Sequence, residues 1–182
     1  GSGLNEPTDG GLTLLGRRAV ARMNELGMAI DISHSGDRTG IGTCRASGSP
    51  VLMTHAGARA LWDIPRLKRD DTLRAVADTG GVIGISAAPH TTCSTRNPRH
   101  TIESVMDHFH YCVDLVGIDH VAFGPDTLYG DHVGLHTTFA GLLGVDGGQP
   151  PPHPTVPYVD GLENPSECFH NLAICLVRDG HS

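Results

Sequence analysis

The sequence predicts an α/β protein that forms part of a (β/α)8 TIM-like barrel, with about four of its βα units. Short apolar runs of strand character alternate with helical segments along the chain. These runs are apolar on both faces, which is typical of parallel strands that helices cover. A sheet of only four strands would leave two edges unpaired. We therefore expect residues 1–182 to form a single, incomplete domain.

A self-contained doubly wound domain is the competing architecture, since it also alternates strands with helices. The first predicted strand is not followed by a Gly-x-Gly-x-x-Gly turn, so this alternative carries no indication of a dinucleotide. The unpaired edges favour the partial barrel.

The first helix and the first two strands lie before residue 56. Thr13 can cap this helix and Gly27 can end it. Residues 28–34 follow as a strand, residues 37–48 form a weak helix or turn, and residues 50–55 form the second strand. The expected inner face of the first helix consists of Leu15, Ala19, Met23 and Leu26.

The third and fourth strands flank the clearest helix of the chain. Asp70 or Asp71 can cap a short helix that precedes a strand over residues 81–86. Thr101 can cap the next helix, whose apolar stripe leads to a fourth strand over residues 120–124. We expect Val, Ile and Met side chains of these strands to face the barrel interior.

A long Gly- and Pro-rich loop covers residues 127–161. It contains His132 and His136, whose spacing is similar to that of metal ligands, but Gly134 between them weakens a helix. A solvated or substrate-lining loop is the favoured interpretation. A last helix begins at Asn164, with an expected inner face of Phe169, Leu172, Ala173 and Leu176.

Composition excludes several classes of protein. The 182 residues carry 13 Lys and Arg against 20 Asp and Glu, and a net charge of −7 argues against nucleic-acid or anionic membrane partners. No run reaches the roughly 18 apolar residues of a membrane span. The five cysteines lack paired spacing, so we expect reduced thiols and a cytoplasmic location.

Residues able to bind metals or protons follow three of the four predicted strands: His34, His55 and Asp126. The carboxyl ends of parallel strands meet at one edge, where functional groups gather. Imidazole and carboxylate groups bind zinc-like cations, and such an ion lowers the pKa of its bound water to about 7. Two interpretations stay open here: a catalytic metal site, or buried polar groups that serve the fold.

Most other histidines are expected on the surface, and the helical cysteines in the core. The histidines concerned are His90, His100, His108, His110, His153, His170 and His181. Cys112 and Cys175 fall within predicted helices and are interpreted as small apolar core residues.

A series of short motifs extends along nearly the whole chain. They are Gly11–Arg17, Met23–Met28, Asp31–His34, Ser49–His55, Gly80–Ile85, Gly117–Asp126 and Tyr158–Glu163. In this order they resemble the motifs of the membrane dipeptidase (renal dipeptidase, peptidase M19) family. The resemblance implies that the chain is the C-terminal half of a dipeptidase barrel of the metal-dependent hydrolase type.

The resemblance also implies a zinc-dependent dipeptidase, in which a metal-bound hydroxide hydrolyses the peptide bond of dipeptides. The complete family enzyme holds two zinc ions bridged by a Glu, and His34 and His55 correspond to the two His that hold one of them. Arg66, eleven residues after His55, corresponds to the Arg that binds the substrate carboxylate. Asp126 corresponds to a catalytic Asp near the substrate amine and the attacking water.

The sequence departs from the family pattern in three places. No His-x-Asp motif and no matching Glu precede His34, so we expect the isolated chain to bind at most one ion and to lack activity. Leu128 stands where many members have a second Asp, which indicates a subgroup. The family's final helix is also not found after Ser182.

Two other functions are compatible with these residues. One is a related metal-dependent amidohydrolase that acts on other small amides. The other is a non-catalytic half-barrel fragment. The full-length protein is compatible with a homodimer.

Overall fold

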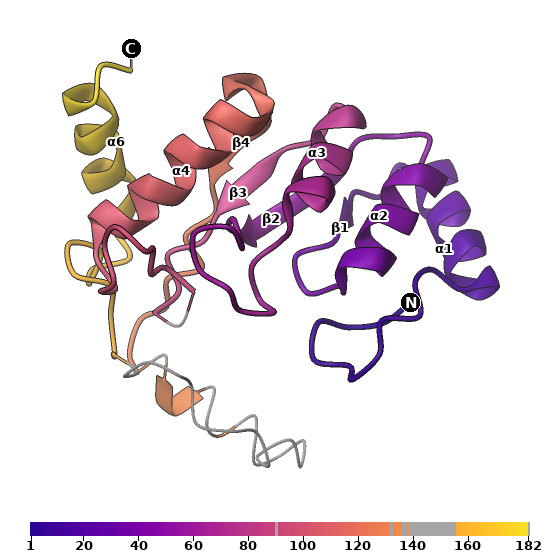
Figure 1. The fold of residues 1–182 in the computed structure, drawn as a ribbon, viewed down its shortest axis with the longest axis horizontal. Coiled ribbons are helices and arrows are strands. Elements are labelled where there is room, and N and C mark those ends of the chain that lie inside the picture. The colour runs from indigo at the N-terminus through magenta and orange to yellow at the C-terminus, as the bar shows by residue number, and fades with distance from the viewer. Residues whose placement is uncertain (90, 132, 136–137, 139–155, 182) are drawn as a thin grey trace.

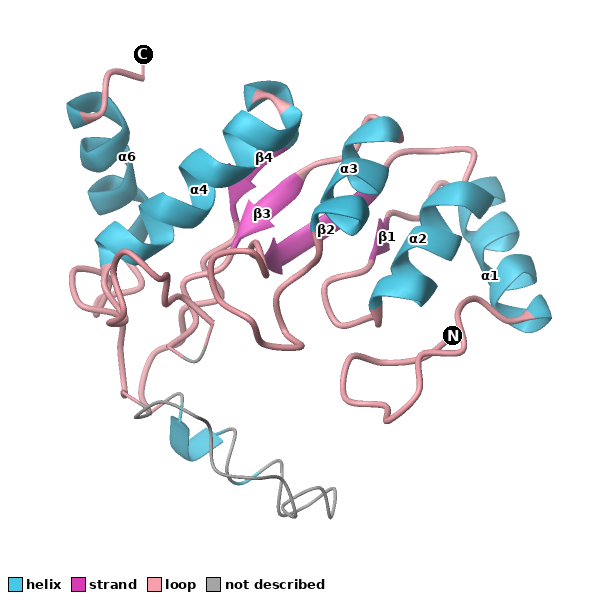
Figure 2. Ribbon diagram, viewed as in Figure 1, coloured by secondary structure: helices cyan, strands magenta, loops and turns pink. Residues whose placement is uncertain are grey.

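The computed structural model of the chain describes residues 1–89, 91–131, 133–135, 138 and 156–181. It contains a four-stranded sheet with helices along one of its faces (Figures 1 and 2). In chain order the elements are α1 (Leu14–Glu25), β1 (Ile30–Asp31), α2 (Asp37–Ala46), β2 (Val51–Ala56), α3 (Asp70–Asp78), β3 (Ile83–Ile85), α4 (Ile102–Val116), the 3-10 helix η1 (Ile118–His120), β4 (Val121–Phe123) and α6 (Cys168–Arg178).

The strands follow one another across the sheet in the order β1-β2-β3-β4, and every neighbouring pair is parallel. Each strand is therefore reached from its neighbour by a helical crossover, which is the winding of a (β/α)8 barrel. A doubly wound sheet would instead reverse its strand order. The predicted α/β class and the barrel-type arrangement are confirmed.

The ends of the helices test the predicted caps. Thr13 caps α1 by accepting a hydrogen bond from the Gly16 amide, and Thr101 forms a capping box with Ser104 on α4, as expected for such residues. The N-cap of α3 is Arg69 rather than Asp70 or Asp71.

The last helix, α6, begins at Cys168 rather than at Asn164. The Asn164 side-chain oxygen accepts a hydrogen bond from the Ser166 amide at 3.1 Å, and the Asn164 carbonyl accepts one from the Glu167 amide at 3.0 Å. This local turn competes with helix formation, because the Asn164 side-chain oxygen accepts from the amide two residues later in place of a backbone carbonyl.

The core lies between the sheet and the helices. Its strand residues Val51, Met53, Ile83 and Ile85 are all fully buried. Successive side chains of a strand point to opposite faces, so the other face of the sheet carries the residues between these. Leu52 on that face is partly exposed, and Asp31, Thr54 and Ala122 are exposed. The expectation that Val, Ile and Met fill the barrel interior is therefore wrong, since these side chains pack under the helices.

The buried faces of α1 and α6 agree with the prediction in part. On α1, Met23 packs against the core as predicted, but the buried residue is Val20 and Leu15 is 76% exposed. On α6, Leu172 is buried and Leu176 packs against the core as predicted, whereas Phe169 is exposed. Both helices carry apolar residues on more than one side, so the contact with a neighbouring element, such as α2 for α1, decides which side is buried.

Two histidines expected on the surface are buried instead. His108 is 1% exposed; its Nδ1 accepts a hydrogen bond from the Ala58 amide, and its Nε2 lies 2.9 Å from the Cys93 carbonyl oxygen. His100 is also buried, with Nδ1 2.8 Å from the Thr92 hydroxyl. Both side chains find polar partners inside the protein, which offsets their desolvation.

The structure tests the expectations for the cysteines and for membrane spans. All five cysteines are free and buried, and Cys112 and Cys175 lie in the core as predicted. His90, His132, His136 and His153 lie outside the described residues, as does most of the 127–161 loop. Within the described part of the chain, no helix has both the length and the apolar character needed to cross a membrane.

Candidate metal and substrate site

The structure brings the two predicted ligand histidines together at the carboxyl ends of neighbouring strands. His34 follows β1 and His55 lies near the end of β2, and their Nε2 atoms are 3.0 Å apart. Two nitrogens bound to one tetrahedral zinc ion, at about 2.0–2.1 Å each, would lie about 3.3 Å apart. The pair therefore fits a shared cation with little rearrangement.

Thr54 sets the tautomer of His55. The Thr54 hydroxyl donates to the Asp31 carboxylate at 2.8 Å and lies 2.7 Å from His55 Nδ1. Because the hydroxyl proton is given to Asp31, the His55 Nδ1–H must be the donor in the second contact. Nε2 of His55 then carries no proton and accepts a hydrogen bond from His34 Nε2–H. An unprotonated Nε2 is the form that can bind a cation, and the chain of partners behind it is typical of metal-binding histidines.

Asp31 is the centre of this hydrogen-bond network. Its carboxylate accepts hydrogen bonds from the Ser33 amide and hydroxyl at 3.0 and 2.6 Å, and from the Thr54 amide at 3.0 Å and hydroxyl at 2.8 Å. Partial burial raises the pKa of Asp31, but these hydrogen bonds outweigh burial and hold the pKa below its usual value. Asp31 thus remains a carboxylate that orients Thr54.

The electrostatic surroundings keep both histidines neutral. Burial lowers the pKa of His34 and of His55, and the positive charge of Arg66 lowers both further. Asp126 and Asp31 act in the opposite direction without reversing the shift. Neutral imidazole is the form that binds a metal ion, so the site favours the required protonation state.

Arg66 lies against the backbone that carries both histidines. Its side chain is buried, and its Nη1 and Nη2 donate to the carbonyl oxygens of Ser33 at 3.0 Å and His55 at 2.7 Å. The guanidinium therefore bridges the chain just before His34 and the chain at His55. This structural contact is additional to the substrate contact that the sequence predicts.

Asp126 follows β4 and is held by an unusual backbone conformation. It is exposed and has a φ of +55°, and it is the one non-glycine residue with positive φ in the described ranges. The preceding Pro125 carbonyl accepts a hydrogen bond from the Ala87 amide at 2.8 Å, which ties this turn to the chain after β3. Strained conformations of this kind cost about 1–3 kcal/mol and concentrate at functional sites.

Two glycines make room for the irregular end of β2. The pairing of β2 with β3 shifts register between Met53 and Ala56, the stretch that contains His55. A Cβ atom on Gly84 or on Gly124 would lie only 2.1 or 1.7 Å from the Thr54 carbonyl oxygen. The bulge that directs His55 into the site therefore requires glycine at both positions, because the neighbouring atom is backbone.

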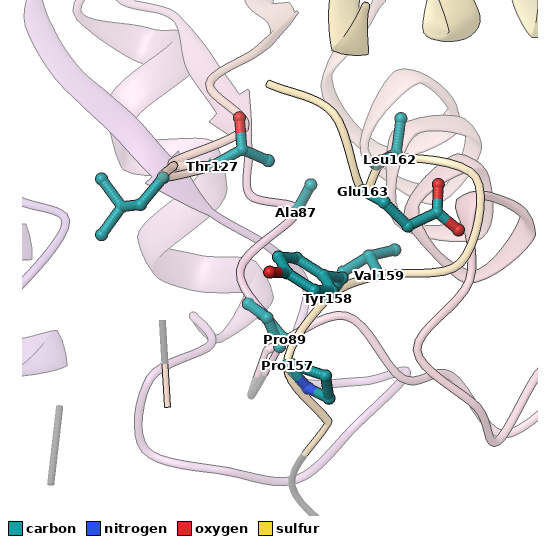
Figure 3. Close-up of a pocket in the computed structure, with 9 residues that line it drawn as sticks. Ala87, Pro89, Thr127, Pro157, Tyr158, Val159, Leu162 and Glu163 are labelled. Carbon is teal, nitrogen blue, oxygen red and sulfur yellow. The ribbon is translucent and has the colours of Figure 1, made fainter. Parts of the chain in front are cut away.

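A small pocket lies between the chain that follows β3 and residues at both ends of the 127–161 loop, including Thr127, which follows Asp126 in the sequence. Its lining residues are Ala87, Pro89, Thr127, Leu128, Pro157, Tyr158, Val159, Leu162 and Glu163. Figure 3 shows Pro157 and Tyr158 next to Pro89 and Ala87. Leu128, at the position where a second Asp was expected from the family pattern, contributes an apolar side chain here.

In the part of the chain that the structure describes, no group of three or more His, Cys, Asp or Glu side chains could hold a metal ion. Among these residues, His34 and His55 form a pair rather than part of a larger group. Sequence analysis did not assign roles to Asp31, Thr54, Gly84 or Gly124. The sequence signal for Asp31 is Ser33 two residues later. An Asp side chain commonly accepts a hydrogen bond from the amide of the residue two positions after it.

Comparison with known proteins identifies the family of the chain. The family model described as membrane dipeptidase (peptidase family M19) matches residues 2–145. The chain belongs to this family. An uncharacterized protein in the pqqA 5′ region of Klebsiella pneumoniae is 35% identical over 134 residues, which cover 69% of this chain and 49% of that protein. Dipeptidase aclJ of Aspergillus oryzae is 34% identical over 121 residues, which cover 66% of this chain and 29% of that protein.

Two solved structures share the fold. An amidohydrolase from Pseudomonas aeruginosa has a TM-score of 0.82 and 29% identity, over 99% of this chain and 54% of that chain. A metallopeptidase from Rhodobacter sphaeroides, liganded with a phosphinate mimic of the dipeptide L-Ala-D-Ala, has a TM-score of 0.58 and 28% identity, over 78% of this chain and 42% of that chain. The chain thus spans about half or less of the length of the relatives it matches.

Proposed function

We propose that this chain forms part of the active site of a metal-dependent dipeptidase, to which it contributes one pair of metal ligands, a substrate-binding Arg and a catalytic Asp. The observation that carries the proposal is the 3.0 Å approach of His34 Nε2 and His55 Nε2, together with the Asp31–Thr54 network that leaves Nε2 of His55 unprotonated. Membership of the M19 metallopeptidase family supports metal dependence.

Zinc is the proposed metal, because two neutral imidazoles are typical ligands of this ion. When bound, zinc would polarise the scissile carbonyl and lower the pKa of a bound water to about 7. His34 and His55 would hold the ion, and their depressed pKa values keep them available as ligands near neutral pH.

Arg66 and Asp126 would orient the dipeptide. The Arg66 guanidinium uses one N–H of each terminal nitrogen on backbone carbonyls, which leaves further N–H groups for a substrate carboxylate. The exposed Asp126 carboxylate would accept a proton or bind the free amine of the substrate. Its charge acts on His34, His55 and Arg66, which supports its place at the same site.

Hydrolysis of dipeptides by the full-length protein tests this proposal. We expect turnover of dipeptides that is lost on treatment with a chelator and restored by Zn²⁺. Dipeptides with an N-terminal acetyl group should be poor substrates, because they lack the amine that Asp126 would bind. Absence of metal-dependent turnover of any dipeptide in a panel would contradict the proposal.

A related amidohydrolase activity is the second candidate. It is favoured by the Pseudomonas aeruginosa structure, which is named an amidohydrolase and matches 99% of this chain. It is also favoured by Leu128, an apolar side chain that lines the small pocket where many family members have a second Asp. Faster turnover of N-acyl amino acids or lactams than of dipeptides would support this candidate.

A further inference from the structure

Lys68 is a buried cation close to the candidate site, and neither the sequence motifs nor the family comparison gives it a role. Its side chain is 1% exposed, and among the described residues it is the largest side chain that is fully buried. Burial lowers its pKa to about 8, against the opposing charge of Asp37. Placing an ammonium group in the interior is costly, so its position calls for a specific partner.

That partner is the backbone next to His34. Lys68 Nζ donates to the carbonyl oxygen of Ser35, the residue directly after His34. Asp37 attracts the ammonium group electrostatically, while its carboxylate accepts hydrogen bonds from Arg59 Nη1 at 2.6 Å and from the Thr72 hydroxyl at 3.1 Å. The ammonium group therefore acts on the chain that carries the ligand rather than in a simple ion pair.

The backbone of Lys68 is itself fixed to the end of β2. Its amide donates to the Gly57 carbonyl at 2.9 Å, and its carbonyl accepts from the Arg59 amide at 2.8 Å. Lys68 thus connects the chain just after His55 with the chain just after His34. Arg66, two residues earlier, makes the equivalent connection between Ser33 and His55.

Every backbone carbonyl group of residues 32–35, the segment that carries His34, accepts a hydrogen bond. Ile32 accepts from the Ser35 amide at 3.0 Å, Ser33 from Arg66, His34 from the Leu4 amide at 3.0 Å, and Ser35 from Lys68. Two of these four donors are buried cations from one short segment, residues 66–68. Hydrogen bonds from charged donors are stronger than neutral ones, at about 1.5–3 kcal/mol each.

We propose that Lys68 is a positioning residue, which holds the Ser35 carbonyl so that His34 stays in register with His55 for binding of one metal ion. The proposal rests on the proposed metal-binding function of the two histidines. Removal of groups that orient metal ligands typically costs about 10- to 100-fold in metal affinity.

The test measures Co²⁺ binding to the full-length protein through the visible absorption of the bound ion. Lys68→Met keeps the buried volume but removes the charged donor. We expect this variant to bind Co²⁺ at least about tenfold more weakly, with an altered absorption spectrum, whereas Lys68→Arg, which keeps a cationic donor, recovers most of the affinity. The matched control is Arg69→Met, which removes an exposed cation from the neighbouring position.

Wild-type Co²⁺ affinity and an unchanged spectrum in folded Lys68→Met would overturn the proposal, even if its thermal stability falls, since Lys68 would then serve the fold alone. If Lys68→Met does not fold, Lys68→Gln provides a polar replacement, and wild-type affinity in that variant would have the same meaning. Failure of the wild-type protein to bind Co²⁺ would instead overturn the proposed function, and the role of Lys68 with it.

Discussion

The two parts of the candidate site are held in different ways. The histidine pair at the ends of β1 and β2 is supported by Asp31, Arg66 and Lys68, which contact its surroundings from several directions. Asp126, after β4, is exposed and is held by a positive-φ backbone conformation. We infer that the region proposed to bind the metal is built for rigidity, whereas the region proposed to handle protons depends on the conformation of a single turn.

The largest expected effect is on kcat, and it distinguishes the Asp126 turn from the histidine pair. In the full-length protein, Asp126→Asn should lower kcat by about 10²–10⁴-fold, because the amide cannot accept a proton. Metal affinity should stay at the wild-type value, since Asp126 is not one of the proposed ligands. Steady-state kinetics and a Co²⁺ titration measure the two quantities, and a parallel loss of both would show that the regions are not separable.

Gly124→Ala tests whether the backbone directly after β4 supports the position of His55. The new Cβ would lie 1.7 Å from the Thr54 carbonyl oxygen, so β2 must shift. We expect a loss of about 3 kcal/mol in the free energy of unfolding, at the upper end for overpacked sites, and weaker Co²⁺ binding. Gly48→Ala is the control, because its Cβ would meet no atom closer than 3.8 Å. Equal stability of the two variants would refute the steric argument.

Arg66→Lys should affect both the backbone and the substrate. A lysine cannot bridge the Ser33 and His55 carbonyls and also bind a carboxylate with a planar fork. We expect kcat/KM for dipeptides to fall by about 10- to 100-fold, as one lost charged hydrogen bond costs about 1.5–3 kcal/mol. Arg69→Lys, at an exposed position, should be neutral. Unchanged kcat/KM in Arg66→Lys would remove Arg66 from the site.

The smallest expected effect concerns acid stability. The folded pKa of Asp31 is lowered, so its carboxylate stabilises the native state above its unfolded pKa of about 3.9, and this contribution is lost as the pH falls through the folded value. Asp31→Asn should reduce stability at neutral pH and flatten its dependence on pH below about 4. Urea denaturation at several pH values measures this, with Asp114→Asn as an exposed control. A pH profile identical to wild type would contradict the role of Asp31.

Local patterns predicted the order of the elements and the convergence of His34 with His55. The caps at Thr13 and Thr101 depend on residues three apart, and the meeting of the histidines follows from parallel strands whose carboxyl ends share one edge. These features depend only on sequence spacing and on the winding of the sheet, so they could be predicted from the sequence.

The supporting contacts were not predictable, because they join residues far apart in the sequence. Lys68 reaches Ser35, and His108 is buried because the Ala58 amide and the Cys93 carbonyl meet its ring. The wrong inward placement of Leu15 on α1 and Phe169 on α6 has a similar cause, since apolar residues lie on more than one side of each helix and tertiary contact selects between them.

The central claim is that His34 and His55 hold one metal ion together. Its most direct test is a Co²⁺ titration of the full-length protein and of His34→Ala and His55→Ala, with His170→Ala at an exposed position of α6 as the control. We predict that each of the two site variants loses one tightly bound ion and its absorption bands, whereas the control binds as the wild type does. Retention of wild-type stoichiometry and affinity in either His34→Ala or His55→Ala would contradict the claim.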